Sequence, residues 1–360
     1  MQVLIAGGGT GGHLYPGLAV AEELMRRDPS CTVSFVGTVR GLETRVVPAH
    51  GYPLDHIRSA GLKGKSLSAL VRGLSLLPLS ALDAWRVLSR RRPDVVVGVG
   101  GYSSGPVLLL AALRGIPTLL MEQNTAPGFT NRRLARWVRA AAVSYADTLP
   151  YFPGTGFVTG NPVRREFRRG AEVAPDAVAT AGPMRVLIMG GSQGARAIND
   201  AVVAAAPRFA AEVLSITHQT GERDLARVRE GYAAAGVTAT VAAFFHDMDA
   251  RMRACDLVVA RAGASTLAEL TVLGRGSVLV PLPTAADDHQ RKNARVLAEA
   301  GAAEVIDERD LTGERLAQVL TDLLADRARR ARMAAAARAL GKPDAAARVA
   351  ERVVALAGGR

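Results

Sequence analysis

Short apolar runs rich in β-branched residues alternate along this chain with longer stretches in which apolar positions recur every three or four residues. The short runs predict buried strands, and the longer stretches predict amphipathic helices. The strand runs lie at 3–6, 33–36, 94–99, 118–121 and 141–143, then at 185–189, 213–217, 237–243, 256–259, 277–281 and 303–306, and helical stretches at 312–340 and 344–357 end the chain. This alternation predicts an α/β fold with doubly wound parallel sheets.

One local pattern occurs twice. Residues 3–12 read as a strand followed by a glycine-rich turn, and residues 186–195 align with them through Val-Leu-Ile, two glycines and a later glycine. A weaker echo joins the strand runs at 94–97 and 256–259, each followed by glycine. We therefore expect two Rossmann-like halves that face each other across a cleft.

Prolines and glycines crowd residues 153–162, where the sequence predicts the crossover between the halves. The predicted domains are residues 1–160 and 161–343. Residues 344–360 are expected to form a C-terminal helix that packs back on the first domain.

The first glycine-rich turn predicts an anion site. Gly7–Gly12 separates a strand from a helix, so backbone N–H groups and the positive end of the helix dipole are available to a negative group. His13 follows in the first helical turn. A helix N-terminus disfavours imidazolium, and a neutral imidazole beside a bound diphosphate is a competent general base for a hydroxyl. Structural capping or space filling is the alternative role for this histidine.

Two nucleotide-binding alternatives fit the sequence less well. Gly7, Gly9 and Gly12 satisfy the dinucleotide fingerprint, which expects an acidic residue about 20 positions later to hold a ribose. The second strand run ends at Val36 without such a residue, and Glu43 comes too late, so a nicotinamide enzyme is disfavoured. Residues 59–66 nearly match a Walker loop but lack its first glycine, and a flexible basic loop is the better interpretation.

Composition and charge narrow the possible classes of protein and partner further. A chain of 360 residues with 49% hydrophobic and 22% charged residues is long enough for two globular domains. The sequence offers neither a secretory signal nor an apolar run of about 20 residues, and its two cysteines have no metal-ligand spacing, so we expect a cytoplasmic protein. The net charge of +12 is compatible with nucleic acid, an anionic membrane or a phosphorylated substrate. Because aromatic residues make up only 4% and no recognition motif is present, a nucleic-acid partner is not expected.

Polar residues follow several strand runs, at the edge where open parallel sheets bind ligands. Arg261 precedes a predicted helix that holds Glu269, a carboxylate suited to accept hydrogen bonds from both ribose hydroxyls; a solvated glutamate is the alternative. Asp287–Gln290 and Asn293 follow another strand run. Glu122 ends a strand in the first half, but no second acid has a comparable setting, so glycoside hydrolysis is not predicted.

Residues 61–93 combine apolar side chains with basic flanks and contain Pro78, which is expected to break the helical pattern. One interpretation is a segment that lies on an anionic membrane, where each basic residue contributes about 1 kcal/mol. The other is a buried helix of the first domain with an arginine cluster at its C-terminus. The sequence leaves both open.

Taken together, the motifs resemble the MurG family of bacterial glycosyltransferases, which add N-acetylglucosamine to lipid I and so form lipid II for peptidoglycan. The resemblance covers nearly the whole chain. Its carriers are Gly8–His13, Gly100–Tyr102 with Ser104–Pro106, Glu122–Asn124, Gly160–Arg164, Gly190–Arg196, Arg261 with Gly263 and Ala264, Glu269, and Gln290 with Asn293.

The resemblance implies a two-domain GT-B fold, with the acceptor and the membrane on the first domain and UDP-N-acetylglucosamine (UDP-GlcNAc) held largely by the second. It implies a diphosphate contact by Ser192 and Arg164, a uracil contact by the Phe245 backbone, a ribose contact by Glu269 and a sugar contact by Gln290. The full set of implied donor contacts is Thr10, Gly11, Gly12, Asn124, Arg164, Ser192, Phe245, Ala264, Ser265, Thr266, Leu267, Ala268, Glu269 and Gln290.

The mechanism expected from this resemblance is direct displacement with inversion, catalysed by a hexosyltransferase at the cytoplasmic face of the membrane. His13 deprotonates the 4-hydroxyl of the muramyl sugar of lipid I, that oxygen attacks the anomeric carbon, and UDP leaves. Helix N-termini and Arg164 are expected to stabilise the leaving group, and no metal or other cofactor is predicted. The alternatives are a GT-B enzyme that glycosylates a soluble natural product and, less closely, a UDP-sugar epimerase.

Overall fold

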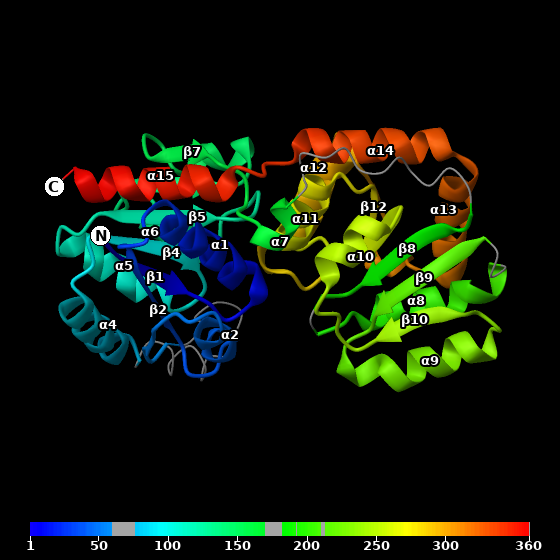
Figure 1. The fold of residues 1–360 in the computed structure, drawn as a ribbon, viewed down its shortest axis with the longest axis horizontal. Coiled ribbons are helices and arrows are strands. Elements are labelled where there is room, and N and C mark those ends of the chain that lie inside the picture. Colours follow the sequence, from blue (N-terminus) through cyan, green and yellow to red (C-terminus); the bar gives the residue numbers. More distant parts are fainter. Residues whose placement is uncertain (60–75, 170–181, 192, 210–212, 360) are drawn as a thin grey trace. The chain divides into compact units, whose positions relative to one another are not determined.

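The computed structural model describes residues 1–59, 76–169, 182–191, 193–209 and 213–359. These residues form two compact units, Met1–Arg164 with Lys342–Arg360, and Arg165–Gly341. Each unit contains one parallel sheet with helices packed on it (Figure 1). The predicted doubly wound α/β fold is confirmed.

The first unit is built on a seven-stranded parallel sheet in the order β3-β2-β1-β4-β5-β6-β7. Its elements are β1 (Gln2–Gly7), α1 (Gly11–Arg27), β2 (Thr32–Gly37), α2 (Glu43–Ala49), β3 (Leu54–His56), α4 (Leu77–Arg91), β4 (Val95–Gly100), α5 (Ser104–Leu113), β5 (Thr118–Glu122), α6 (Phe129–Leu134), β6 (Ala140–Val143), the 3-10 turn η1 (Ala146–Tyr151), β7 (Gly156–Val158) and α15 (Ala345–Gly358).

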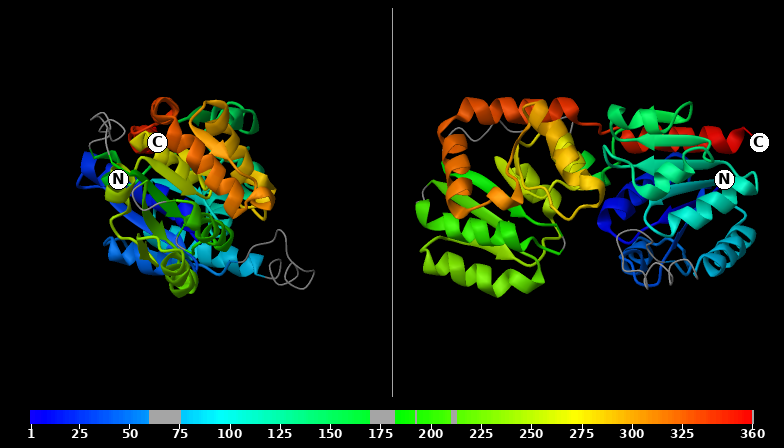
Figure 2. Two further views of the ribbon diagram at one scale, coloured as in Figure 1. Left: turned by 90° about the vertical axis from the view of Figure 1, so that its right-hand side faces the viewer. Right: turned by 180° about the vertical axis from the view of Figure 1, so that it is seen from behind.

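Two apolar layers cover the first sheet. One joins its strands to α1, α2 and α15, and the other joins them to α4 and α5. Burial of Val349, Ala350 and Val353 fixes α15 beside α1 (Figures 1 and 2). The chain returns to this unit over Gly160, where a Cβ atom would lie 2.5 Å from Cβ of Lys342.

The second unit has a six-stranded parallel sheet in the order β10-β9-β8-β11-β12-β13. Its elements are α7 (Arg165–Arg168), β8 (Met184–Met189), α8 (Arg196–Ala205), η2 (Ala206–Arg208), β9 (Leu214–Gln219), η3 (Glu222–Asp224), α9 (Leu225–Ala234), β10 (Ala239–Ala242), α10 (Met248–Ala254), β11 (Leu257–Ala260), α11 (Ala264–Leu273), β12 (Ser277–Leu279), η4 (Ala286–Asp288), α12 (His289–Glu299), β13 (Ala303–Val305), η5 (Glu308–Asp310), α13 (Gly313–Ala325) and α14 (Arg327–Leu340).

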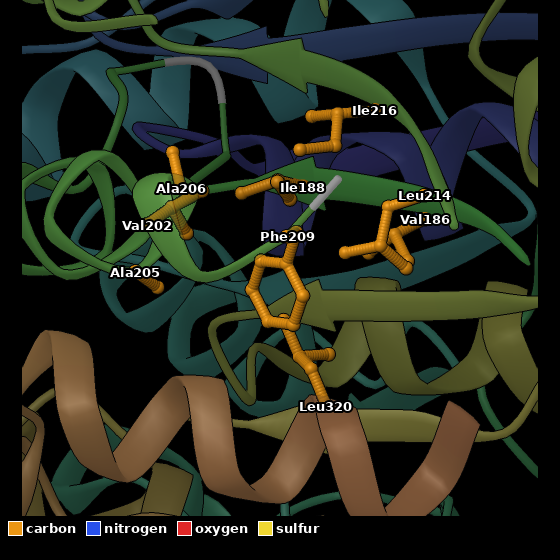
Figure 3. Close-up of a pocket in the computed structure, with 9 residues that line it drawn as sticks. All are labelled: Val186, Ile188, Val202, Ala205, Ala206, Phe209, Leu214, Ile216 and Leu320. Atoms are coloured by element: carbon orange, nitrogen blue, oxygen red, sulfur yellow. The ribbon is translucent and has the colours of Figure 1, made fainter. Parts of the chain in front are cut away.

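The core of the second unit packs α8, α9 and α13 on the strands. A small apolar cavity of about 10 Å³ remains among β8, β9, α8 and α13, next to Phe209 and Leu320 (Figure 3). Its volume is about that of one water molecule, so it is a packing defect and not a nucleotide site.

Three local predictions need correction. The stretch 312–340 is two helices, because Asp326 ends α13 and caps α14 by accepting a hydrogen bond from the Arg329 backbone N–H at 2.7 Å. Pro78 does not break a helix: it lies in the first turn of α4, where an absent N–H removes no helical hydrogen bond. The sequence reading also missed β3 and β7, three-residue strands at the two edges of the first sheet.

Candidate active site

The first glycine-rich loop joins β1 to α1 in extended and left-handed conformations. Gly7, Gly8 and Gly9 have φ values of 143°, 147° and 87°, which side chains rarely tolerate. Thr10 is the N-cap of α1, with φ −125° and ψ 158°. Gly11, Gly12 and His13 therefore form the first turn of the helix, as the sequence predicts.

A buried carboxylate anchors this loop by hydrogen bonds. Glu43 is fully buried and accepts hydrogen bonds from the backbone N–H of Gly9 at 2.7 Å, and from the N–H and hydroxyl of Thr38 at 2.8 and 3.0 Å. A Cβ atom on Gly8, Gly37 or Gly41 would run into it. The N–H of Gly9, which a phosphate would otherwise use, is thus already bonded to an anion.

His13 lies between the loops that follow β1 and β4. Its Nδ1 is 3.3 Å from the Thr10 hydroxyl, and its ring packs so closely on Gly100 that a Cβ atom there would be 2.7 Å from Cδ2. Gly100 also has φ 94°. The absent side chain at Gly100 therefore makes room for the imidazole.

Glu122 organises the loop that carries Asn124. Its carboxylate accepts hydrogen bonds from both the backbone N–H and the side-chain amide of Asn124, at 3.0 and 3.2 Å, and from Gly128 N–H and the Asn131 amide at 3.1 and 2.7 Å. Burial raises the pKa of Glu122, and these donors oppose that rise. Its role here is to position Asn124 at the end of β5.

Arg164 is the last residue before the second unit and belongs to the first. Its guanidinium stacks on the ring of Tyr15 in α1, 4.8 Å from the ring centroid. A cation–π contact of this kind fixes the direction of a long side chain without neutralising its charge. Arg164 is thus anchored next to the helix that carries His13.

The second glycine-rich loop joins β8 to α8. Gly191 and Gly194 have φ values of 85° and 73°, and a Cβ atom on Gly194 would lie 2.0 Å from the carbonyl oxygen of Thr220. The loop therefore packs directly against the end of β9. Ser192, the predicted diphosphate contact, lies outside the described residues.

Neutral polar groups support this second loop. His218 is buried in β9; its Nδ1 is 3.0 Å from the Tyr232 hydroxyl and its Nε2 is 3.0 Å from Oδ1 of Asn199 in α8. The Asn199 amide donates in turn to the Thr220 carbonyl at 3.0 Å and to Asp224 at 2.8 Å. Burial lowers the pKa of His218 to about 4, so the imidazole is neutral at pH 7.

Phe245 follows β10 and is 7% exposed. Its backbone N–H donates to Oε1 of Gln219 at 2.9 Å, and the Arg251 guanidinium lies 3.8 Å from the centroid of its ring. The predicted uracil contact is therefore a well-anchored segment at the carboxyl edge of the sheet.

The predicted donor stretch 264–269 is the first part of α11, which begins after Gly263. Leu267 is 1% exposed, so its side chain belongs to the core, and its backbone N–H bonds the Gly263 carbonyl at 3.0 Å. Glu269 is 7% exposed and lies in the second turn. The alternative of a solvated glutamate is thus wrong.

The loop after β12 is strained. Asp287 and Asp288 have φ values of 54° and 55°, which are unfavourable outside glycine and tend to occur at functional sites. Gln290 lies in the first turn of α12, and its Oε1 accepts the Leu282 N–H at 3.0 Å. Arg261 reaches the same loop, donating to the Val280 carbonyl at 3.2 Å and pairing with Glu308.

A separate surface of the first unit is apolar and basic. One side of α4 is buried through Ala84 and Leu88, but its other side and α5 expose large side chains. The exposed residues are Leu77, Leu79, Leu82 and Trp85 on α4, and Leu109 and Leu113 on α5. Arg114 stacks on Trp85, 4.6 Å from its ring. The interpretation as a helix packed in the first domain thus holds for the buried face of α4, whereas the membrane interpretation of its exposed face stays a prediction, and residues 61–75 lie outside the described residues.

Next to this surface, α6 packs on α5 and carries arginines. Arg132, Arg133 and Arg136 line a hollow of about 500 Å³ together with Tyr151. Within the described parts of the chain, no helix is long and apolar enough to cross a bilayer, and no three acidic, histidine or cysteine side chains cluster as metal ligands do.

Several supporting residues were missed in the sequence reading. Glu43 was considered only as a ribose ligand, and Gln219, His218 and Asn199 were not singled out. His218 and Gln219 directly follow the strand run at 213–217, which is the one signal that pointed to them. Their partners lie 14 to 28 residues away in sequence, so spacing gives no indication of the contacts.

Two parallel-sheet units, each with a glycine-rich loop after its first strand, define the GT-B class of glycosyltransferases. The chain matches the family models described as "Glycosyltransferase family 28 N-terminal domain" over residues 3–143 and "Glycosyltransferase family 28 C-terminal domain" over residues 185–349. Within this class, the chain belongs to the MurG family.

Three relatives support that assignment. A protein of Anaeromyxobacter dehalogenans (strain 2CP-C) is 52% identical over 98% of this chain and 92% of its own length, and one of Myxococcus xanthus is 47% identical over the same shares. Both are named UDP-N-acetylglucosamine–N-acetylmuramyl-(pentapeptide) pyrophosphoryl-undecaprenol N-acetylglucosamine transferase. The crystal structure of Acinetobacter baumannii MurG is 33% identical, with a TM-score of 0.79, over 98% of this chain and 99% of that one.

Proposed function

We propose that this protein catalyses the reaction for which its relatives are named, the transfer of N-acetylglucosamine from UDP-GlcNAc to lipid I, which yields lipid II. The single observation that carries the proposal is the 52% identity over 98% of the chain with a protein of that name. The glycine-rich loops offer backbone N–H groups for a diphosphate, and the histidine at the start of α1 offers a general base for the acceptor hydroxyl. The product is the disaccharide unit from which peptidoglycan is made.

His13 is the proposed general base. If Nδ1–H donates to the Thr10 hydroxyl, 3.3 Å away, the neutral ring keeps the Nε2 lone pair for the acceptor proton. The 4-hydroxyl oxygen of the muramyl sugar then attacks the anomeric carbon as UDP leaves, and the configuration inverts. Glu43 and Gly100 hold the imidazole and its loop in place during this step.

The donor is proposed to lie mainly on the second unit. Its diphosphate would be bound by the loop at 190–195 with Ser192, and by Arg164. Its uracil would contact the Phe245 backbone, its ribose Glu269 and its sugar Gln290. The remaining proposed contacts are Thr10, Gly11, Gly12, Asn124 and residues Ala264 to Ala268.

Charge on the leaving diphosphate is proposed to be stabilised by helix N-termini and by the guanidinium of Arg164, without a divalent cation or another cofactor. Preorganised N–H groups do this without reorganising as the charge develops. A chelator should therefore leave the rate unchanged, and the proposal fails if activity is lost with chelator and returns only on adding a cation.

The acceptor carries a polyprenyl tail, and we propose that the exposed apolar residues of α4 and α5 dip into the cytoplasmic face of the membrane. The arginines of α6 would contact anionic headgroups beside them, at about 1 kcal/mol each. Neither nucleic acid nor a soluble acceptor uses such a surface. Trp85→Ser should weaken binding to anionic vesicles, whereas Val354→Ser, at an exposed apolar residue of α15 in the other helix layer of the first unit, serves as the control.

The decisive assay incubates the protein with labelled UDP-GlcNAc and a lipid I analogue and follows the disaccharide product. We expect product only when the acceptor is present, and faster formation with vesicles or detergent. Conversion of UDP-GlcNAc without an acceptor would instead indicate an epimerase. Equal activity on a soluble aglycone would favour a natural-product glycosyltransferase.

A further inference from the structure

The side chain of Gln219 connects two loops of the second unit. Gln219 is the last residue of β9 and is 2% exposed. Its Nε2 donates to the carbonyl oxygen of Gly191 at 3.2 Å, and its Oε1 accepts the backbone N–H of Phe245 at 2.9 Å. One buried amide thus binds the glycine-rich loop after β8 at one end and the segment after β10 at the other.

Both partners are backbone groups in irregular structure. Gly191 has φ 85°, and its carbonyl also accepts the N–H of Gly194 at 3.1 Å. Phe245 lies beyond the end of β10 at Ala242, so the sheet ladder supplies no partner for its N–H. Because a buried backbone group without a partner is costly, the amide of Gln219 selects one arrangement of the two loops.

The surroundings give these loops little room to rearrange. A Cβ atom on Gly194 would lie 2.0 Å from the Thr220 carbonyl oxygen, and one on Gly221 would lie 2.7 Å from the Gln193 carbonyl oxygen. Asn199 holds the Thr220 carbonyl from the other side at 3.0 Å. A shorter or apolar side chain at position 219 would therefore leave the Phe245 N–H without its acceptor and remove one of the two donors to the Gly191 carbonyl.

We propose that Gln219 is a positioning residue that couples the diphosphate and base subsites of the nucleotide-sugar site. The proposal rests on the proposed function, in which the loop at 190–195 binds the diphosphate and Phe245 the base. Gln219 does not itself touch the donor. It fixes the spacing of the two loops so that one nucleoside diphosphate spans both.

The test compares two nucleotides that differ by one phosphate. Calorimetry with UDP and UMP is run on the wild type and on Gln219→Met, which keeps the volume but removes both hydrogen bonds. We expect UDP affinity to fall about tenfold and UMP affinity about threefold or less, so that the ratio of the two affinities falls. In the transfer assay, the KM for UDP-GlcNAc should rise about tenfold, with kcat within about threefold and the acceptor KM unchanged.

Gln318→Ala is the control, because it removes an exposed amide of the same unit, which donates to Asp322 one turn further along α13 at 2.7 Å. If the ratio of UDP affinity to UMP affinity in the variant equals that of the wild type, whether both affinities fall equally or neither falls, the coupling is overturned. If Gln219→Met does not fold, as seen in its melting curve, Gln219→Asn gives the same ratio test, because its shorter neutral amide cannot reach both loops. Failure of the proposed function is seen separately, as absence of transfer by the wild type.

Discussion

The two glycine-rich loops follow equivalent strands of the two sheets, β1 and β8, but are supported by different groups. The loop after β1 is held by a buried carboxylate, Glu43, whose oxygen accepts the Gly9 N–H at 2.7 Å. The loop after β8 is held by a neutral amide, Gln219, with the neutral imidazole of His218 below it. A carboxylate beside a loop repels a further anion, whereas an amide does not. The difference supports the proposal that the second loop binds the donor diphosphate and the first loop positions His13.

The largest expected effect concerns the first loop. His13→Ala should lower kcat about a thousandfold, because general base catalysis contributes about 10²–10⁴-fold. UDP affinity, measured by calorimetry, should stay within about twofold if the diphosphate is bound elsewhere. His50→Ala removes an exposed histidine from α2 and is the matched control. Near-normal turnover by His13→Ala would rule out its role as the base.

A charge placed under the second loop tests the comparison next. Gln219→Glu gives that loop the kind of support that the first loop has. Two like charges about 6 Å apart repel by about 3 kcal/mol at an effective dielectric constant of about 20, so UDP affinity should fall roughly a hundredfold. The loss should be smaller for UMP, which carries less charge. Unchanged UDP affinity would mean that the diphosphate does not lie over this loop.

The converse change neutralises the support of the first loop. Glu43→Gln keeps the size of the side chain but replaces one of its two acceptor oxygens by an NH₂ group. That group is a donor and would face the N–H or hydroxyl donors that the oxygen now accepts. We expect kcat to fall about tenfold as the loop shifts under His13, with UDP affinity unchanged. Glu22→Gln on α1 provides a control for loss of one negative charge. A large gain or loss in UDP affinity for Glu43→Gln would contradict the division of roles between the loops.

A further effect, outside catalysis and binding, is on the pH dependence of stability. The folded-state pKa of His218, about 4, lies below the value of about 6.5 for an unfolded histidine. As pH falls below about 6.5 the unfolded chain takes up the proton first, so stability is lost progressively down to about pH 4, by at most about 3 kcal/mol. Denaturant midpoints at pH 7 and 5 should differ less in His218→Gln than in the wild type. An identical pH dependence would mean that His218 is not held neutral.

The sequence predicted the parts of this molecule that depend on local pattern. Strand, glycine-rich turn and helix follow one another at 3–24 and 186–205, and each local step favours the next, so both loops and the position of His13 were predictable. The edge strands β3 (Leu-Asp-His) and β7 (Gly-Phe-Val) were missed because they lie outside the longer apolar runs that revealed the equally short β12 and β13. Asp326 divides one apparent helix into two because its side chain caps the second.

The supports of the loops were not predictable in the same way. Glu43 lies 34 residues from Gly9 and Gln219 lies 26 residues from Phe245, and only the assembled sheets bring these pairs together. The sequence shows a glutamate and a glutamine near strand ends, but their acceptors and donors are backbone groups of other loops. Backbone partners carry no sequence signal, so the chemistry that distinguishes the two loops becomes apparent only in the folded chain.

The most direct test of this division is a crystal structure of the protein with UDP bound. The account predicts phosphate oxygens within hydrogen-bond distance of backbone N–H groups in residues 190–195, with the Glu43 carboxylate still bonded to the N–H of Gly9. A phosphate on the Gly9 N–H, with Glu43 displaced, would contradict it.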